Sequence, residues 1–117
     1  VIIFFKKGVN MATFYALGRY TAQGYQGFCK NPKSDRAQAA KTAAEAVGAK
    51  LVSYTGLRGS YDFLAVFEGT FVQGAAVKMA TEASGSLCDI AVCEAININE
   101  VAENAAKIAS AYKGPGK

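Results

Sequence analysis

Apolar residues follow two different spacings along the chain, and these predict where strands and helices lie. Alternating or aromatic-rich runs are typical of strands, whereas apolar residues three or four positions apart are typical of helices. The pattern predicts strands at 12–20, 50–55, 61–68 and 87–95, and helices within 34–48, 70–83 and 100–112. Residues 21–30 show no strong period, so we interpret them as a loose turn of helix, a loop, or both.

Capping residues mark the expected helix ends. Ser34 is a suitable N-cap for the first helix, and Gly48 lies just past its alanine-rich apolar stripe. Thr70 is the expected cap of the second helix, which Gly85 follows. Asn99 is the expected cap of the last helix. These signals agree with the apolar spacing in placing three helices.

The order of the elements predicts the fold class. Strands 50–55 and 61–68 are joined by the short, glycine-bracketed segment "GLRG", which favours an antiparallel hairpin. The whole order is then βαββαβ with one more helix, which is the ferredoxin-like arrangement of the α+β class. We therefore expect a four-stranded antiparallel sheet with two helices on one face.

The predicted sheet is apolar on both faces. An antiparallel sheet with one face in water normally shows a polar row on that face. Two helices cover one face only, so alternation leaves an open apolar side, which we assign to Leu17, Leu64, Val66, Ile90 and Val92. Such a surface usually marks a contact site. We therefore expect self-association, as a homodimer closed into an α+β barrel or as a hexamer or larger ring.

Charged residues are assigned to the same open face, namely Arg19, Asp62, Glu68 and Glu94. Charged side chains are seldom buried unless they are paired. They are therefore expected either at the rim of the dimer contact or around a polar cavity inside it. For Arg19 we favour an ion pair with Glu68 or Glu94, and the alternative is that it binds a ligand carboxylate or phosphate.

Composition narrows the class of protein. The chain has 117 residues, about half of them hydrophobic, which suits one globular domain. The net charge of +4 owes much to lysines near the ends, and scattered charge argues against nucleic acid as a partner. Three cysteines without a CxxC pair indicate neither a disulfide framework nor a zinc knuckle, and a reducing cytoplasm is the expected compartment.

Several kinds of site are missing from the sequence. It contains no histidine, which excludes a Ser-His-Asp triad and a His-based metal centre. It has neither GxGxxG nor GxxxxGK[ST], so no nucleotide loop is supported. Cys88 and Cys93 are five positions apart on one strand and are expected on opposite faces. We expect no cofactor and no metal.

The first ten residues, VIIFFKKGVN, permit two interpretations. They lack the pattern of a secretory signal and are too short for a membrane span. The apolar run is strand-forming and suits an edge strand or an arm that contacts another subunit. The alternative, which we favour, is that Met11 is the start, because Lys6-Lys7-Gly8 can be encoded by a run that resembles a bacterial ribosome-binding site.

Several collinear segments resemble a known family. They are "MATFYALGR", "TAQG", "DRAQAA", "VGAKLVSYTGLRGSYDFLAVFE" and "SLCDIAVCEAININE". Together they resemble the GYD domain family of small prokaryotic proteins from Met11 to about Glu100, with the signature here as Gly59-Ser60-Tyr61-Asp62. The resemblance implies a dimeric α+β barrel without an established reaction. We therefore place an extension at 1–10, the domain at 11–99, and a C-terminal helix with a flexible tail at 100–117.

Candidate site residues surround the signature. Gly59 is expected to supply a positive φ at the hairpin. Asp62 is the one candidate for an acid or base, and we favour the alternative that it accepts hydrogen bonds at the turn or strand edge. The ligand-binding candidates are Tyr15, Arg19, Tyr54, Tyr61 and Asp62.

Three hypotheses of function remain open at this point. The leading one is a homo-oligomeric barrel that binds a small molecule between subunits. The second is a cofactor-free isomerase, dehydratase or monooxygenase with Asp62 as base and with Arg19 and Tyr61 as orienting groups. The third is an assembly module in which the last helix joins dimers into larger rings.

Overall fold

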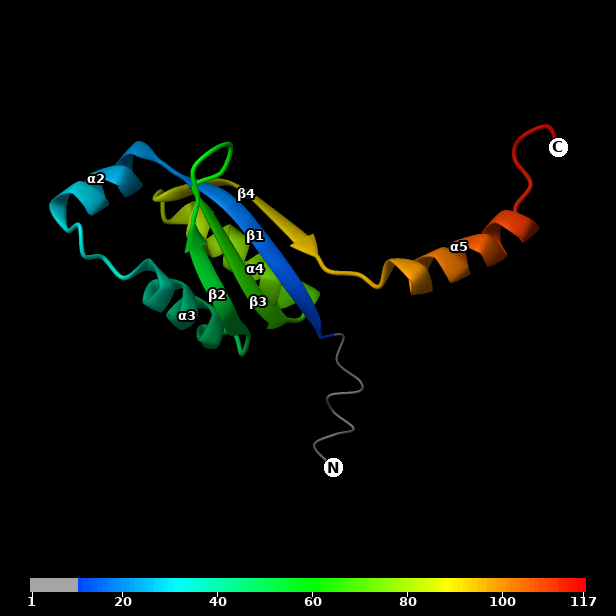
Figure 1. Ribbon diagram of the computed structural model, residues 1–117, viewed down its shortest axis with the longest axis horizontal. Coiled ribbons are helices and arrows are strands. Elements are labelled where there is room, and N and C mark those ends of the chain that lie inside the picture. Colours follow the sequence, from blue (N-terminus) through cyan, green and yellow to red (C-terminus); the bar gives the residue numbers. More distant parts are fainter. Residues whose placement is uncertain (1–10) are drawn as a thin grey trace, which may run out of the picture.

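The computed structural model describes residues 11–117 (Figure 1). The expectations for Val1–Asn10 therefore lie outside the described residues. The elements in chain order are β1 (Ala12–Tyr20), α2 (Ala22–Lys30), α3 (Arg36–Ala46), β2 (Lys50–Gly56), β3 (Phe63–Gly69), α4 (Phe71–Ala83), β4 (Leu87–Glu94) and α5 (Ile98–Ala111). The expected order of strands and helices is confirmed, and residues 22–30 form a helix.

The four strands form one antiparallel sheet in the order β2-β3-β1-β4. Helices α3 and α4 pack on β2 and β4 respectively, and both cover the same face of the sheet (Figure 1). This is the ferredoxin-like arrangement, so the predicted α+β class is confirmed. The loop that joins β2 to β3 carries Gly59, whose φ of 141° lies in the range that favours glycine.

Local capping explains where the helices begin, and it corrects two predicted caps. The N-cap of α3 is Asp35 rather than Ser34, because the Asp35 side chain accepts from Gln38 N. The N-cap of α5 is Asn97 rather than Asn99, because its side chain accepts from the N–H groups of Asn99 and Glu100. Thr70 caps α4 as predicted.

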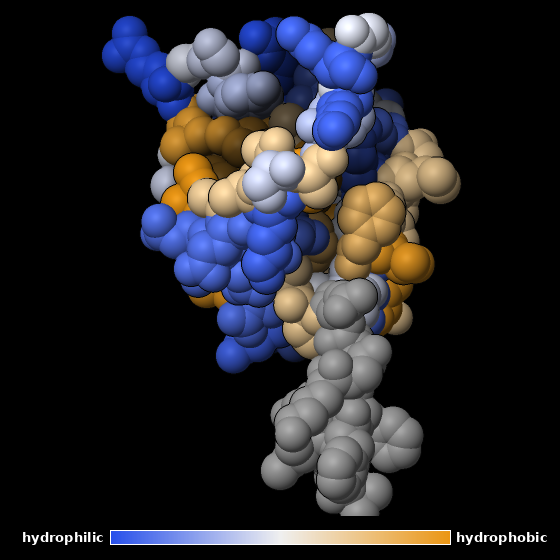
Figure 2. Space-filling view, turned by 90° about the vertical axis from the view of Figure 1, so that its right-hand side faces the viewer, coloured by the Kyte–Doolittle hydropathy of each residue, from blue (hydrophilic) through white to orange (hydrophobic). Residues whose placement is uncertain are grey.

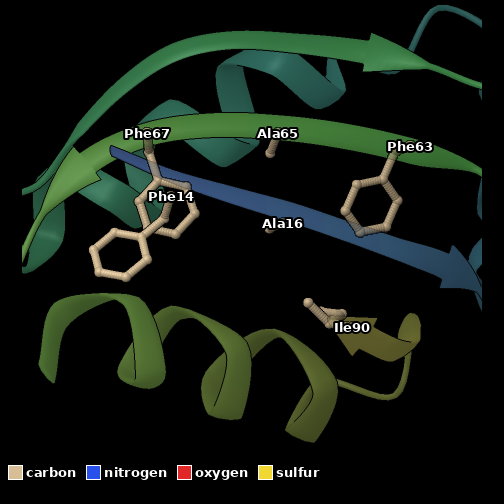
Figure 3. Packing of buried hydrophobic residues seen from close by; sticks show 6 residues of the cluster. All are labelled: Phe14, Ala16, Phe63, Ala65, Phe67 and Ile90. Atoms are coloured by element: carbon tan, nitrogen blue, oxygen red, sulfur yellow. The ribbon is translucent and has the colours of Figure 1, made fainter. Parts of the chain in front are cut away.

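The core lies between the sheet and the two covering helices (Figure 3). Its buried sheet residues are Phe14, Ala16, Phe63, Ala65, Phe67 and Ile90. The rings of Phe14 and Phe67 are stacked with their centroids 5.6 Å apart. Gly74 on α4 is buried, and a Cβ there would meet the Phe14 ring at 3.7 Å, an ordinary van der Waals distance.

A bulge in β4 overturns the predicted orientation of that strand. Leu17 pairs with Ala91 but Arg19 pairs with Cys88, so β4 contains one extra residue, at Asp89, whose φ is 53°. The extra residue reverses the phase of alternation. The N–H of Ile90 donates instead to the Glu82 carboxylate of α4, at 2.9 Å.

Because of this reversal, three residues that we assigned to the open face lie on the helix side. The two cysteines of β4, which we expected on opposite faces, share one face. Ile90 is a core residue and Val92 packs against the core, so neither lies on the open face. Glu94 pairs with the core residue Phe14 and lies on the helix side. Cys88 and Cys93 pair with Arg19 and Tyr15, and therefore lie on the same face of the sheet.

The last helix stands apart from the rest of the fold. Every residue of α5 is exposed, and in Figure 1 the helix lies beyond the end of the sheet. Figure 2, viewed from that end, shows hydrophobic and hydrophilic residues side by side at the surface. Among residues 11–117, no helix has both the length and the apolar character needed to span a membrane.

Candidate functional site

The sheet face opposite α3 and α4 is open and has an apolar centre. Register places Tyr15 and Leu17 of β1 beside Val66 and Leu64 of β3, and beside Cys93 and Ala91 of β4. Tyr15 is 38% exposed. A bulge in β2 adds Val52, which is 53% exposed, to the same side. The predicted open apolar face is thus present, but β4 contributes different residues to it.

The GYD signature lies at one end of this face, where it joins the hairpin to the end of β1. The Asp62 N–H donates to the Gly18 carbonyl at 2.8 Å, and one carboxylate oxygen of Asp62 accepts the Tyr20 N–H at 3.0 Å. The Arg19 Nε–H donates to the Ser60 carbonyl at 2.8 Å. Each hydrogen bond links the hairpin to β1, so the signature anchors the two segments to each other.

The close approach of the two segments depends on Gly18. A Cβ at Gly18 would lie 2.6 Å from the Phe63 ring and 2.9 Å from Ile90. Distances this short exclude a side chain unless the core shifts. The absence of a side chain at Gly18 therefore lets the Phe63 ring pack against β1 directly beside Asp62.

Tyrosines surround the same end of the sheet. The rings of Tyr25 and Phe28, both on α2, meet the Tyr20 ring edge-on, with centroids 5.8 and 5.0 Å away. The hydroxyls of Tyr20 and Tyr54 form a hydrogen bond. Burial raises the pKa of Tyr54, and the hydrogen bond to Tyr20 adds to this effect. A hydrogen bond to the Asp62 carboxylate raises the pKa of Tyr25.

The structure brings together some of the predicted site residues and separates others. Tyr15 and Arg19 lie on the same side of β1, and Asp62 borders the Arg19 end of that side. Tyr61, next to Asp62 in the loop, is half-buried. Tyr54 packs against the core on the helix side of the sheet. It stacks on Phe63 at 5.6 Å and lies away from Tyr15.

Arg19 does not form the ion pair that we expected. Register places Glu68 opposite Thr13, six residues along β1 from Arg19, or about 20 Å at the usual rise of a strand. Glu94 lies on the helix side, opposite Phe14. Within residues 11–117 the one ion pair is Lys78 with Glu82, at 2.9 Å. The guanidinium therefore keeps nitrogen donors beyond the Nε–H that Ser60 accepts.

A wide hollow lies at the opposite end of the sheet. It has a volume of about 1000 Å³ and lies between α5 and the end of the sheet, where Glu68, Glu94 and Glu100 line it. Since α5 scarcely contacts the body, this hollow is an open wedge rather than an enclosed site. A smaller apolar gap of about 90 Å³ lies inside the core.

The sequence analysis does not identify two of the tyrosines at this end of the sheet, Tyr20 and Tyr25. Tyr25 lies in the segment interpreted as a loose turn or loop, because Gly24 and Gly27 weaken its helical signal. Tyr20 ends β1 and carries no motif. The signal available was the spacing of Tyr25 and Phe28, which are three positions apart and so share one side of a helix that begins at Ala22; this spacing does not indicate a contact with Tyr20.

Comparison with known proteins gives one match. The family model described as GYD domain matches residues 14–105, which is most of the chain and reaches into α5. The match covers the open face, the signature and both covering helices. No curated protein and no solved structure matches the chain.

Proposed function

This chain belongs to the GYD domain family, and we propose that it is a homodimer that binds a small organic carboxylate between its two open sheet faces. The observation that carries the proposal is the open face itself. It combines an apolar centre with a guanidinium at one end that makes no ion pair within residues 11–117. No sequence motif assigns a reaction to this arrangement.

A second copy is the expected cover for the face. Burying about 500 Å² of apolar surface contributes on the order of 12 kcal/mol before the costs of association. Arg19 lies at one end of the face and Glu68 at the other. If two copies stack with their β1 strands antiparallel, the basic end of each face meets the acidic end of the other. Such a pairing has the twofold symmetry that is usual for soluble oligomers.

The chemistry of the face selects the ligand class. The Nη donors of Arg19 suit a carboxylate, which a guanidinium binds through two parallel hydrogen bonds. Tyr15 and Leu17 lie next along the strand and offer an aromatic and aliphatic surface. A small acid with an apolar or aromatic body fits this order of groups.

Asp62 supports binding rather than catalysis. A general base needs a free oxygen within reach of a substrate proton. One oxygen of Asp62 accepts the Tyr20 N–H, and the carboxylate lies near Tyr25, whose pKa it raises. We therefore assign Asp62 a positioning role for the end of β1, and we do not favour the isomerase, dehydratase or monooxygenase hypothesis.

Ligand binding is tested by titration calorimetry with benzoate as the probe. Benzamide, which has the same shape but no charge, is the control compound. The wild type is expected to bind benzoate and not benzamide. Arg19→Gln should weaken benzoate binding about 10- to 100-fold, because it removes a charge-assisted contact. Arg58→Gln at the exposed hairpin tip is the control and should bind normally. Equal affinities in the two variants would contradict the assignment of Arg19.

The test of the dimer uses native mass spectrometry and light scattering. Leu64→Glu places a charge in the apolar centre of the face. It should lower the subunit count at least twofold while the chain stays folded, and it should not bind benzoate. Gln38→Glu, on the exposed surface of α3, is the control and should leave the dimer intact. A wild-type protein that is monomeric at micromolar concentration would overturn the proposal.

A further inference from the structure

We propose that α5 is an arm that docks on the outer face of α4 in a second copy of this chain. The proposal does not depend on the sheet-face dimer, because α4 lies on the opposite side of the sheet. It rests on two unpartnered apolar helix faces that one chain carries and that match each other.

The first face belongs to α5, which is amphipathic and exposed along its whole length. Its apolar residues fall on one stripe at helical spacing, made of Ile98, Val101, Ala102, Ala105, Ile108 and Ala109. Ile108 is 65% exposed. The polar residues Glu100, Glu103 and Lys107 occupy the other side. Isolated helices of this length are marginal in water, so the stripe needs a surface to pack on.

The second face belongs to α4, and its polarity is the reverse of an ordinary surface helix. The most exposed residues of α4 are all apolar, and they are Phe71, Val72, Ala75, Met79, Ala80 and Ala83. Phe71, Val72 and Met79 are each more than 70% exposed. The charged residues Lys78 and Glu82 pair with each other, and Glu82 also accepts the Ile90 N–H of β4. An apolar outer face of this kind marks a contact surface.

The two faces match in length and in their pattern of large and small side chains. Helices of 14 and 13 residues are about 21 and 20 Å long. Each stripe mixes alanines with large side chains, Val101 and Ile108 on α5 and Phe71 and Met79 on α4. Alternation of large and small residues lets two helices interdigitate at the usual axial distance of about 8–10 Å.

The connection between β4 and α5 is too short for the arm to dock on its own α4. Three residues, Ala95, Ile96 and Asn97, join the two elements, and they span about 10–13 Å when extended. The Ala95 N–H also donates to the Thr13 carbonyl at 2.8 Å, which holds the start of the connection on β1. A helix on the outer face of α4 lies about 20 Å from the sheet, since α4 itself intervenes. The α4 partner of this arm therefore belongs to another copy.

The experiment uses single charges in the full chain and native mass spectrometry. Ile108→Glu on α5 and Met79→Lys on α4 should each lower the subunit count of the wild-type assembly at least twofold, with an unchanged circular dichroism spectrum. Ser110→Glu, two residues from Ile108 and on the polar side of α5, is the matched control and should leave the count unchanged. A sheet-face dimer that exists independently should survive all three changes.

A mixing experiment separates contacts between chains from contacts within one chain. Ile108→Glu chains mixed with Met79→Lys chains should recover the wild-type subunit count, because the new Glu on one copy meets the new Lys on the other. A lower melting temperature with no change in subunit count would overturn the proposal, since the arm would then pack within its own chain. A response to Ile108→Glu but not to Met79→Lys would also overturn it, because α5 would then dock on a surface other than α4.

Discussion

Gly18 and Gly27 show how differently two glycines are used in one chain. A Cβ at Gly18 would meet the Phe63 ring at 2.6 Å, whereas a Cβ at Gly27 in α2 meets nothing within 4 Å. Gly18→Ala should therefore lower the free energy of unfolding by about 1–3 kcal/mol through overpacking. Gly27→Ala should raise it by about 0.5–1 kcal/mol, because alanine favours the helix. Urea denaturation measures both, and equal effects would mean that β1 does not pass this close to Phe63.

At the residue scale, Tyr54 makes the stability of the fold depend on pH. Burial and the hydrogen bond to Tyr20 raise its pKa in the folded state above the ordinary value of 10.0. The contribution of Tyr54 to the free energy of unfolding is therefore complete below pH 10. It is lost as the pH rises above this value, because Tyr54 ionises first in the unfolded chain. The urea midpoint should fall between pH 9 and pH 11, and the fall should be smaller in Tyr54→Phe.

The control for this prediction is Tyr112→Phe, because Tyr112 follows α5 and is 68% exposed. It should keep the wild-type pH dependence. Absorbance titration at alkaline pH offers a second measurement. The folded wild type should contain a late-ionising tyrosine that is missing from Tyr54→Phe. An unchanged titration curve in that variant would contradict the burial of the Tyr54 hydroxyl.

At the scale of elements, the bulge in β4 depends on Asp89. Its φ of 53° lies in the left-handed region, which Asp tolerates and which glycine adopts without strain. Asp89→Gly should therefore keep the stability of the wild type, whereas Asp89→Val should lose about 1–3 kcal/mol because a β-branched residue is strained there. Thermal and urea unfolding measure the difference. A tolerated valine would mean that β4 lacks the bulge.

The elements also show which features the sequence predicts and which it does not. The bounds of β1 and the Thr70 cap follow from local patterns that act within a few residues. The faces of Ile90, Val92 and Glu94 were assigned wrongly, because strict alternation does not reveal where an extra residue reverses the phase. A tertiary contact accompanies the reversal, since the Ile90 N–H donates to Glu82 on α4, and local alternation does not reveal such a contact.

Some features of the candidate site could likewise be predicted from the sequence, and others could not. Asp62 and Arg19 were identified from the signature and from the strand, and they do meet at one end of the sheet through Ser60 and Tyr20. The expected pairing of Arg19 with Glu68 was wrong, because strand register separates them by the length of β1. Tyr25 was missed because its position depends on how α2 folds back over Tyr20, which local spacing does not encode.

At the scale of the whole molecule, the open sheet face predicts that stability depends on protein concentration. If the folded form is a dimer and the unfolded form is a single chain, a hundredfold rise in concentration adds about 2.7 kcal/mol of stability per dimer. For two chains of this size, that energy corresponds to a rise in melting temperature of about 6 °C. Scanning calorimetry at 1 and 100 µM measures it. The double variant Leu64→Glu with Ile108→Glu, which removes the contact of α5 as well, should melt at one temperature at both concentrations, because a monomer has no association to gain. A wild-type melting temperature that is independent of concentration would show instead that the face stays open to water, and the apolar side chains of β1 and β3 would then need another partner.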